Sequence, residues 1–306
     1  MGWADPMKMG RFLPPLSALA FLCLTLASQA GEPEAAQQHF LWKVTGGNGV
    51  VFLFGTVHVG KKDLYPLASV IEDSFKQSDI LIEEVDPTNA SESLHLAQDV
   101  IKGGVYQDGD SIGKHLSEAT RARLTEYAKS GQLGADYTRA KPWLLSLMII
   151  QHQLKEMGFD QSKGLDQHFM QEATDTHKAI GALETGDSQL RLFSSFPDDL
   201  QDQLLLTTLL DAAEATDILD RTLKAWSSGN TEAMDDLINR DVRDHPVLQP
   251  LMEKMFYERN DAMTQQIEKF LQTGKTYFVA VGAGHLVGER GIVKQLRRKN
   301  YTVEQP

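Results

Sequence analysis

Short apolar runs at the two ends of the chain enclose a long stretch of helical periodicity. Near the start, "HFLWKVT" and "VVFLFGT" flank the turn signal "GGNG" at residues 46–49, which predicts a β-hairpin. Residues 66–77 predict a helix with Pro66 in its first turn, and "DILIEEVD" follows as an apolar strand. Near the other end, "TYFVAVGAGH" predicts a strand, "ERGIVKQLRRKN" a helix and "YTVEQ" a last strand.

The middle of the chain, from about residue 92 to 273, repeats apolar positions at helical spacing. For example, one helix is expected to begin at the N-cap residue Ser117 and to end at Gly131. One apolar segment, "KAIGALETGD", interrupts the helices and predicts a short strand ending at Glu184. The pattern therefore predicts an α/β fold: a mixed sheet built from N- and C-terminal strands with a large helical middle region, forming a single domain over residues 31–306.

Residues 1–30 have the pattern of a secretory signal peptide. Lys8 and Arg11 precede the apolar run "FLPPLSALAFLCLTLA", and small residues end the segment at Ala30. The run is short and interrupted by proline, which disfavours a transmembrane helix. We therefore expect a periplasmic or secreted protein. An uncleaved leader is the alternative, and it would hold the protein at a membrane.

The amino-acid composition excludes several kinds of binding and catalytic site. With 306 residues, 42% hydrophobic and 24% charged, the chain can bury a sizeable core. The formal net charge of -12 and the absence of a basic cluster argue against a nucleic-acid partner. The single cysteine, Cys23, lies in the leader, so the mature protein would have no thiol nucleophile, disulfide or zinc-thiolate site. Nitrogen and oxygen ligands must then hold any metal ion.

Four predicted strands have polar functional groups at or just after their C-terminal ends: His58, the pair Glu83 and Glu84, Glu184, and His285. If the strands are parallel neighbours, these groups meet in the crevice outside the carboxyl ends of the strands. Two imidazoles and a carboxylate suit a divalent transition metal with open positions, and a second carboxylate could act as general base. Side chains alternate along a strand, so only one of Glu83 and Glu84 can face the crevice, and we expect the other to be solvated or ion-paired.

Two charged positions have alternative interpretations. Glu184 could instead cap a helix that starts near Asp187. Arg259 falls four residues from Met255 and from Met263, on or beside an apolar helical stripe. There it needs a carboxylate partner or a bound anion, unless its side chain reaches solvent.

The C-terminal segment also permits a dinucleotide-binding interpretation. Gly282, Gly284 and Gly288 follow a strand and precede a helix, and Glu304 ends the next strand. The expected export argues against a cytosolic redox cofactor, so we favour the hydrolase-type site. The common esterase, zincin and P-loop motifs are absent from the sequence.

Several motifs, in order along nearly the whole mature chain, resemble the TraB/PrgY/GumN family, whose relatives include the Tiki metalloproteases. They are "FLFGTVHVG", "LIEEVD", "KPW", "GLDQHF", "LETGDSQL", "ERNDAM" and "FVAVGAGHLVGERGIVKQLRRKNYTV". The family's acidic E-x-D element matches Glu84 and Asp86, which favours Glu84 over Glu83. The resemblance implies a fold shared with erythromycin-esterase-like and ChaN-like proteins. It also implies an active site at the matching positions His58, Glu84, Glu184, Arg259, Asn260 and His285.

The resemblance further implies a metal-dependent hydrolase, because Tiki members are regarded as metal-dependent peptidases. We expect His58 and His285, together with Glu84 or Glu184, to hold Mn²⁺, Co²⁺ or Zn²⁺, while the remaining glutamate activates water.

Arg259 and Asn260 are expected to orient the substrate or to stabilise a developing oxyanion. A peptide or protein is the favoured substrate. A metal-free esterase-like hydrolase using His58 as base, and a non-catalytic periplasmic binding protein for a peptide or glycan, are the alternatives.

Overall fold

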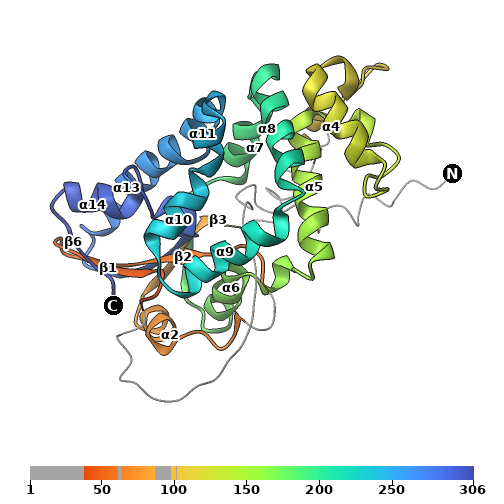
Figure 1. Cartoon of the computed structure of the whole chain (residues 1–306). Coiled ribbons are helices and arrows are strands. Elements are labelled where there is room, and N and C mark those ends of the chain that lie inside the picture. Colours follow the sequence, from red (N-terminus) through yellow and green to blue (C-terminus); the bar gives the residue numbers. More distant parts are fainter. Residues whose placement is uncertain (1–37, 61–63, 87–97, 101) are drawn as a thin grey trace.

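The computed structural model describes residues 38–60, 64–86, 98–100 and 102–306 (Figure 1). The expected leader, residues 1–30, and Cys23 within it lie outside the described residues. Among the described residues, no helix is long and apolar enough to cross a membrane.

A mixed sheet forms the centre of the described chain, with six strands in the order β4-β3-β5-β2-β1-β6. The strands β4, β3, β5 and β2 are parallel, β1 is antiparallel to β2, and β6 is antiparallel to β1. Strands from the two ends of the chain are thus interleaved, and the prediction of a mixed α/β sheet with a helical middle is confirmed. The bounds are β1 Leu41–Thr45, β2 Val50–Thr56, β3 Ile80–Val85, β4 Ala179–Glu184, β5 Thr276–Gly282 and β6 Thr302–Glu304.

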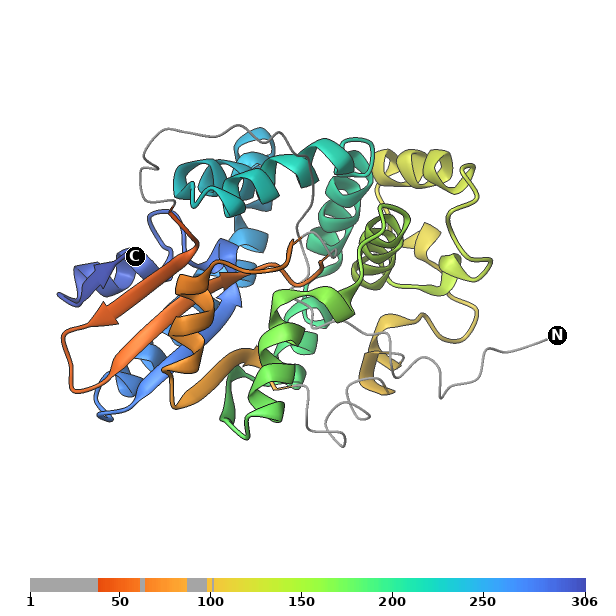
Figure 2. The ribbon, with the colours of Figure 1, turned by 90° about the horizontal axis from the view of Figure 1, so that it is seen from below.

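Helices cover both faces of this sheet. In Figure 1, α2 and α6 lie below it, while α10, α13 and α14 lie above it. Figure 2, seen from below, shows α2 and α6 in front of the strands. The helices are α2 Ser69–Lys76, α4 Glu118–Ala128, α5 Pro142–Glu156, α6 Leu165–Asp175, α7 Gly186–Ser194, α8 Asp198–Asp211, α9 Ala215–Ser227, α10 Thr231–Ile238, α11 Arg240–Asp244, α12 Gln249–Met252, α13 Glu258–Phe270 and α14 Ile292–Arg298.

Short turns complete the helical middle. A π-helical turn, η6 (Glu253–Tyr257), lies between α12 and α13, and π turns inside helices are often found at functional sites. The remaining turns are the 3₁₀ segments η2 Ile112–Lys114, η3 Tyr137–Arg139, η4 Gln161–Lys163, η5 Pro246–Leu248 and η7 Ala283–His285.

Aromatic side chains pack the sheet against its lower helices. Phe54 of β2 and Phe278 of β5 contact Phe169 of α6, with ring centroids 5.5 and 4.8 Å away, and Phe75 of α2 also contacts Phe169 at 5.0 Å. The indole of Trp226 in α9 contacts the same Phe54 ring, with ring centroids 6.5 Å apart, and its Nε1 donates to the carbonyl oxygen of Gly55, 2.8 Å away. These contacts fix the end of β2, from which the chain continues to His58.

Two details differ from the sequence prediction. The predicted helix over residues 66–77 begins only at Ser69, because Ala68 keeps an extended backbone and Leu67 turns into the core. The dinucleotide-binding interpretation is wrong, because β6, which ends at Glu304, does not pair with β5. It pairs with β1 at the far edge of the sheet, so β5, α14 and β6 do not form the adjacent βαβ unit that a dinucleotide requires.

Candidate active site

The parallel register brings four strand ends to one edge of the sheet. Thr56 at the end of β2 pairs with Gly282 at the end of β5, and Val85 of β3 pairs with Glu184 of β4. Because parallel strands end at the same edge, the side chains that follow them meet there. The structure brings together all the predicted candidates: His58, Glu84, Glu184, Arg259, Asn260 and His285.

The carboxylate of Glu84, which is only 4% exposed, lies at the centre of this group. Its Oε1 is 4.0 Å from Nε2 of His58 and 3.7 Å from Nε2 of His285. Oε1 also accepts a hydrogen bond from the backbone N–H of Gly282 at 2.6 Å, and Oε2 accepts one from Nη2 of Arg259 at 2.8 Å. Burial opposes ionisation. At the acidic pH where Glu84 titrates, however, the charge of protonated His285, with those of Arg259 and His58 and the Gly282 N–H, outweighs burial and lowers the pKa of Glu84 to about 2.

His58 is held by a carboxylate on its other ring nitrogen. Its Nδ1 lies 2.9 Å from Oδ2 of Asp166, whose Oδ1 accepts a hydrogen bond from the hydroxyl of Thr56 at 2.7 Å. Burial lowers the pKa of His58, but the charge and hydrogen bond of Asp166, together with Glu84, outweigh burial and raise it to about 9. In the absence of a metal ion, His58 is therefore an imidazolium at neutral pH.

Like Gln189 of α7, whose Nε2 donates to Glu184 Oε2 at 3.0 Å, Asp166 is a site residue that the sequence analysis missed. It stands in the first turn of α6, where a negative charge is favourable at a helix N-terminus. The only signal in the sequence is the "GLDQHF" motif, because Asp166 lies on a helix and follows no strand. No periodicity or strand-end argument would select it.

His285 is held by an amide. Nδ1 of His285 lies 2.6 Å from Oδ1 of Asn260, and Nδ2 of Asn260 donates to the carbonyl oxygen of Arg290 at 3.0 Å. Since the amide oxygen can only accept, Nδ1 of His285 carries the proton and Nε2 presents a lone pair toward Glu84. Burial and Arg259 outweigh the attraction of Glu84 and lower the pKa of His285 to about 3, so this imidazole is neutral.

Asn260 therefore has a different role from the expected substrate contact. It is 1% exposed and both of its amide atoms are engaged. The geometry makes it a residue that positions the ring of His285.

Arg259 joins the two site glutamates. Its Nε and Nη2 donate to the two carboxylate oxygens of Glu184, each at 2.9 Å, and Nη2 also donates to Glu84. Its Nη1 donates to the carbonyl oxygen of Met255 in the π turn at 3.0 Å. The interpretation with carboxylate partners is confirmed, because Arg259 is only 9% exposed. The capping interpretation of Glu184 is wrong, since Thr185 caps α7 instead.

Glu83, the neighbour of Glu84, differs from expectation. It is neither solvated nor ion-paired with another described residue: it is 3% exposed, and its Oε1 has no hydrogen-bond partner among the described residues. The cause is α6, which packs against β3. Burial, with the charges of Asp166, Glu84 and Asp86, raises the pKa of Glu83 well above its ordinary value.

Gly282 keeps the space between the imidazoles and the carboxylate open. A Cβ atom on Gly282 would lie 3.1 Å from Nε2 of His58, 3.2 Å from Oε1 of Glu84 and 3.6 Å from Cδ2 of His285. A cavity of about 60 Å³ adjoins this point and is lined by His58, Gly282 and His285, among others. Any larger residue at position 282 would enter the space between the groups that would hold an ion.

The arrangement fits a divalent cation chemically. Nε2 of His58 and Nε2 of His285 both face Glu84 Oε1, and each imidazole has a hydrogen-bond acceptor on its Nδ1, as metal-binding histidines almost always do. Metal bonds of about 2.0–2.2 Å place neighbouring donors of a tetrahedral ion roughly 3.4 Å apart. The observed 3.7 and 4.0 Å would need to close by a few tenths of an ångström. The two imidazole nitrogens would need to move more than an ångström closer, because they and Glu84 Oε1 do not all lie within 4.8 Å of one another.

A second group that could hold a metal ion lies apart from this centre. It consists of Glu72 of α2 with His168 and Glu172 of α6. Nε2 of His168 lies 3.2 Å from Glu72 and 3.9 Å from Glu172. All three side chains are half-buried, and ordinary hydrogen bonding and ion pairing account for these contacts.

Together, the fold and the site define an α/β protein with a buried histidine–carboxylate centre at the carboxyl edge of a mixed sheet. The family model of the TraB/PrgY/gumN family matches residues 40–305, and the chain belongs to this family.

Similar proteins include both uncharacterized proteins and named proteases. The uncharacterized protein YbaP of Escherichia coli strain K12 is 23% identical, over 85% of this chain and 94% of that protein. The metalloprotease TIKI homolog of Amphimedon queenslandica is 25% identical, over 95% of this chain and 66% of that protein. The human metalloprotease TIKI1 is 25% identical, over 94% of this chain and 68% of that protein. No solved structure matches the chain.

Arg259→Met should strongly destabilise the protein, because it leaves Glu84 and Glu184 buried without their shared cation. We expect the free energy of unfolding at pH 7 to fall by about 3–5 kcal/mol, measured by urea denaturation. Arg243→Met is the matched control, because it breaks an exposed pair with Asp236 and should cost less than about 1 kcal/mol. Equal, small losses in the two variants would contradict the assigned role of Arg259.

The lowered pKa of His285 predicts a stability that depends on pH. Its folded value of about 3 lies below the unfolded 6.5, so its contribution is complete above pH 6.5 and is lost as the pH falls toward 3. Between pH 6 and pH 4, chelator-treated wild type should lose up to about 1.4 kcal/mol more per pH unit than His285→Gln. Urea denaturation across this range measures the free energy of unfolding at each pH. His245→Gln, which changes an exposed histidine, is the control and should follow the wild-type curve. Parallel curves for wild type and His285→Gln would disprove the assignment.

Proposed function

We propose that this protein is an exported metal-dependent hydrolase that cleaves peptide bonds. The observation that carries the proposal is the approach of two hydrogen-bond acceptors, Nε2 of His285 and Oε1 of Glu84, which face each other at 3.7 Å. The Tiki relatives, named metalloproteases, support the same reaction class.

This approach is unfavourable without a cation. Nδ1 of His285 carries the ring proton, so Nε2 has a lone pair, and Glu84 is ionised. In a buried site, a lone pair and a carboxylate oxygen without a proton between them repel each other. A divalent ion held by His285, Glu84 and His58 would replace this repulsion with two attractions. Nitrogen and oxygen donors of this kind suit Zn²⁺, Co²⁺ or Mn²⁺.

The other residues of the site hold and complete this centre. A bound divalent ion would polarise the scissile carbonyl group and lower the pKa of water. Arg259 fixes the carboxylates of Glu84 and Glu184 with hydrogen bonds of 2.8–2.9 Å. Because Glu84 lies between the imidazoles, we assign Glu184, whose side chain is 14% exposed, as the acceptor of the proton from the attacking water.

The hollows around the site favour an extended substrate. The cavity at His58 and His285 shares Ile238 and Phe256 with an apolar cavity of about 190 Å³ and with a more polar one of about 370 Å³. A polypeptide could occupy space on both sides of the reacting bond, which a small ester would leave unused. We therefore favour a peptide or protein substrate.

A metal-free hydrolase with His58 as general base is less well supported. With a pKa near 9, His58 holds its proton at neutral pH, so it could donate a proton but not accept one. A non-catalytic binding protein for a peptide or glycan could use the same crevice, and only an activity measurement separates it from an enzyme.

Activity should depend on both a metal ion and the centre. Protein treated with a chelator and then supplied with Mn²⁺, Co²⁺ or Zn²⁺ should cleave a mixed peptide library, read by mass spectrometry. His58→Ala should lose at least about 100-fold in rate, because an ion ligand is gone. Gly282→Ala should lose as much, because its Cβ enters the ion's space. In Gly113→Ala, the matched control, the new Cβ meets nothing within 4 Å and wild-type activity should remain. Undiminished activity in His58→Ala would refute the metal-dependent mechanism.

Export is a separate part of the proposal. When the full chain is expressed in a Gram-negative host, we expect the protein in the periplasmic fraction with Gly31 as its first residue, because small residues at Ser28 and Ala30 suit signal peptidase. N-terminal sequencing of the recovered protein measures this. Ala30→Leu should block processing and retain the leader. A wild-type protein that keeps residues 1–30 would contradict cleavage and favour a membrane-held form.

A further inference from the structure

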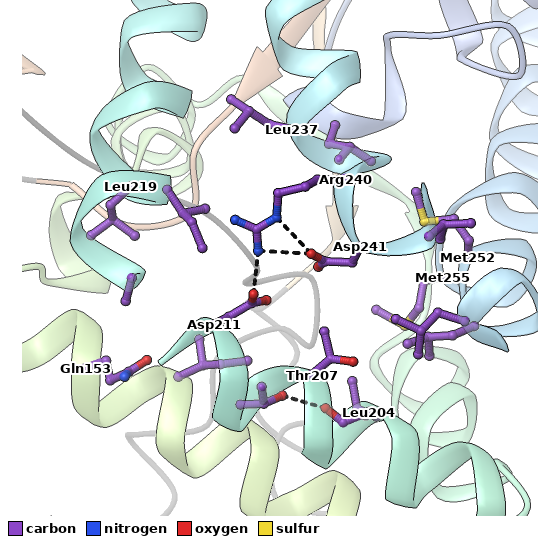
Figure 3. A pocket seen from close by; sticks show the side chains of 18 of the residues that line it. Gln153, Leu204, Thr207, Asp211, Leu219, Leu237, Arg240, Asp241, Met252 and Met255 are labelled. Atoms are coloured by element: carbon purple, nitrogen blue, oxygen red, sulfur yellow. Dashed lines mark hydrogen bonds and ion pairs between the residues drawn. The ribbon is translucent and has the colours of Figure 1, made fainter. Parts of the chain in front are cut away.

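We propose that the apolar cavity beside the active site is the pocket for one large apolar side chain of the substrate, such as phenylalanine, leucine or methionine, next to the scissile bond. This inference rests on the proposed peptidase function and deepens it, because it names a substrate class. Figure 3 shows the cavity and the side chains around it.

The cavity has the size and lining that such a side chain requires. It measures about 190 Å³ and lies among α5, α8, α9, α10 and α12. Apolar cavities of about 150 Å³ in proteins can bind benzene, so this one accommodates a benzyl or branched aliphatic group. Most of its lining is aliphatic, including Leu204, Leu219, Leu237, Met252 and Met255 (Figure 3).

The cavity adjoins the proposed reaction centre directly. Three side chains, Ile238, Met255 and Phe256, line both this cavity and the smaller one at His58 and His285. The ring of Phe256 lies 5.2 Å from the ring of His285. A group seated in the apolar cavity would therefore belong to a residue at or beside the bond that is cut.

The polar groups of the cavity are already engaged. The guanidinium of Arg240 is paired with Asp211 and Asp241, and its Nε donates to Asp241 at 3.0 Å (Figure 3). The amide of Gln153 donates to the carbonyl oxygen of Ala212 at 3.1 Å. With its cation taken up by two carboxylates, the pocket suits an uncharged occupant and not a carboxylate or phosphate group.

The same features favour a side chain over a lipid chain. The Arg240 pair lies among the lining groups, and the volume corresponds to one side chain and not to a long acyl chain. Burying one such side chain provides apolar contact area beside the reacting bond, which discriminates between substrates that differ only at that residue.

The test compares peptides that differ at one residue. Metal-loaded wild type should cleave peptides with phenylalanine at the selected position at least about tenfold more efficiently, in kcat/KM, than peptides with alanine there. Thr207→Phe should fill the cavity from α8 and bring this ratio to about one. Ala215→Phe, which fills it from α9, is a second variant in case the first does not fold. Ala213→Phe places the same ring on an exposed position outside the cavity and should keep the wild-type ratio.

Binding separates this inference from the proposed function. N-acetylphenylalaninamide should bind wild type and Ala213→Phe measurably better than Thr207→Phe, as followed by NMR titration, whether or not cleavage is found. Binding without cleavage would support the pocket while contradicting the peptidase. Cleavage with equal efficiency for phenylalanine and alanine peptides would overturn the pocket. So would preferential binding of decanoate that Thr207→Phe abolishes, because it would show an acyl-chain site.

Discussion

The buried carboxylate of Glu84 is the constraint on which the rest of the site depends. A carboxylate that is only 4% exposed stays ionised only if hydrogen bonds and positive charge replace its lost hydration. The backbone N–H of Gly282 and the guanidinium of Arg259 supply them, at 2.6 and 2.8 Å. These partners come from β5 and α13, and Glu84 itself from β3. The register of the sheet and the position of α13 are therefore tied together at this one group.

The two imidazoles show how the same short motif acquires opposite chemistry. Each histidine follows a strand and a glycine, and each turns its Nε2 toward Glu84. The two rings differ in the group at Nδ1. In His58 this group is the carboxylate of Asp166, which raises the pKa of the ring to about 9. In His285 it is the uncharged amide of Asn260, and burial and the neighbouring Arg259 lower the pKa to about 3. An incoming cation would thus displace a proton from His58 but find the lone pair of His285 already available. The centre is built asymmetrically, although its sequence signals are alike.

Much of this arrangement could be predicted from the sequence, because the ends of parallel strands lie at the same edge of a sheet. Apolar runs ending in polar groups predicted the strands and placed His58, one of Glu83 and Glu84, and His285 at one edge, and the family resemblance selected Glu84. The helical stripe indicated that Arg259 needs a carboxylate or an anion unless it reaches solvent. The groups that the sequence did not reveal act from helices. Asp166 stands in the first turn of α6, where an acidic residue is common without any function. The burial of Glu83 depends on how α6 packs, which strand alternation alone does not determine.

The π turn η6 explains why the site and the apolar cavity belong together. Within this turn, the carbonyl oxygen of Met255 accepts a hydrogen bond from Nη1 of Arg259, and the side chains of Met255 and Phe256 line both cavities. The same backbone segment thus helps to hold the cation that compensates Glu84 and forms the wall that a substrate side chain would touch. A helix of regular geometry offers its carbonyl groups to its own backbone, whereas a π turn locally disturbs that pattern. A substrate side chain in the cavity would therefore contact the same turn that helps to hold Arg259.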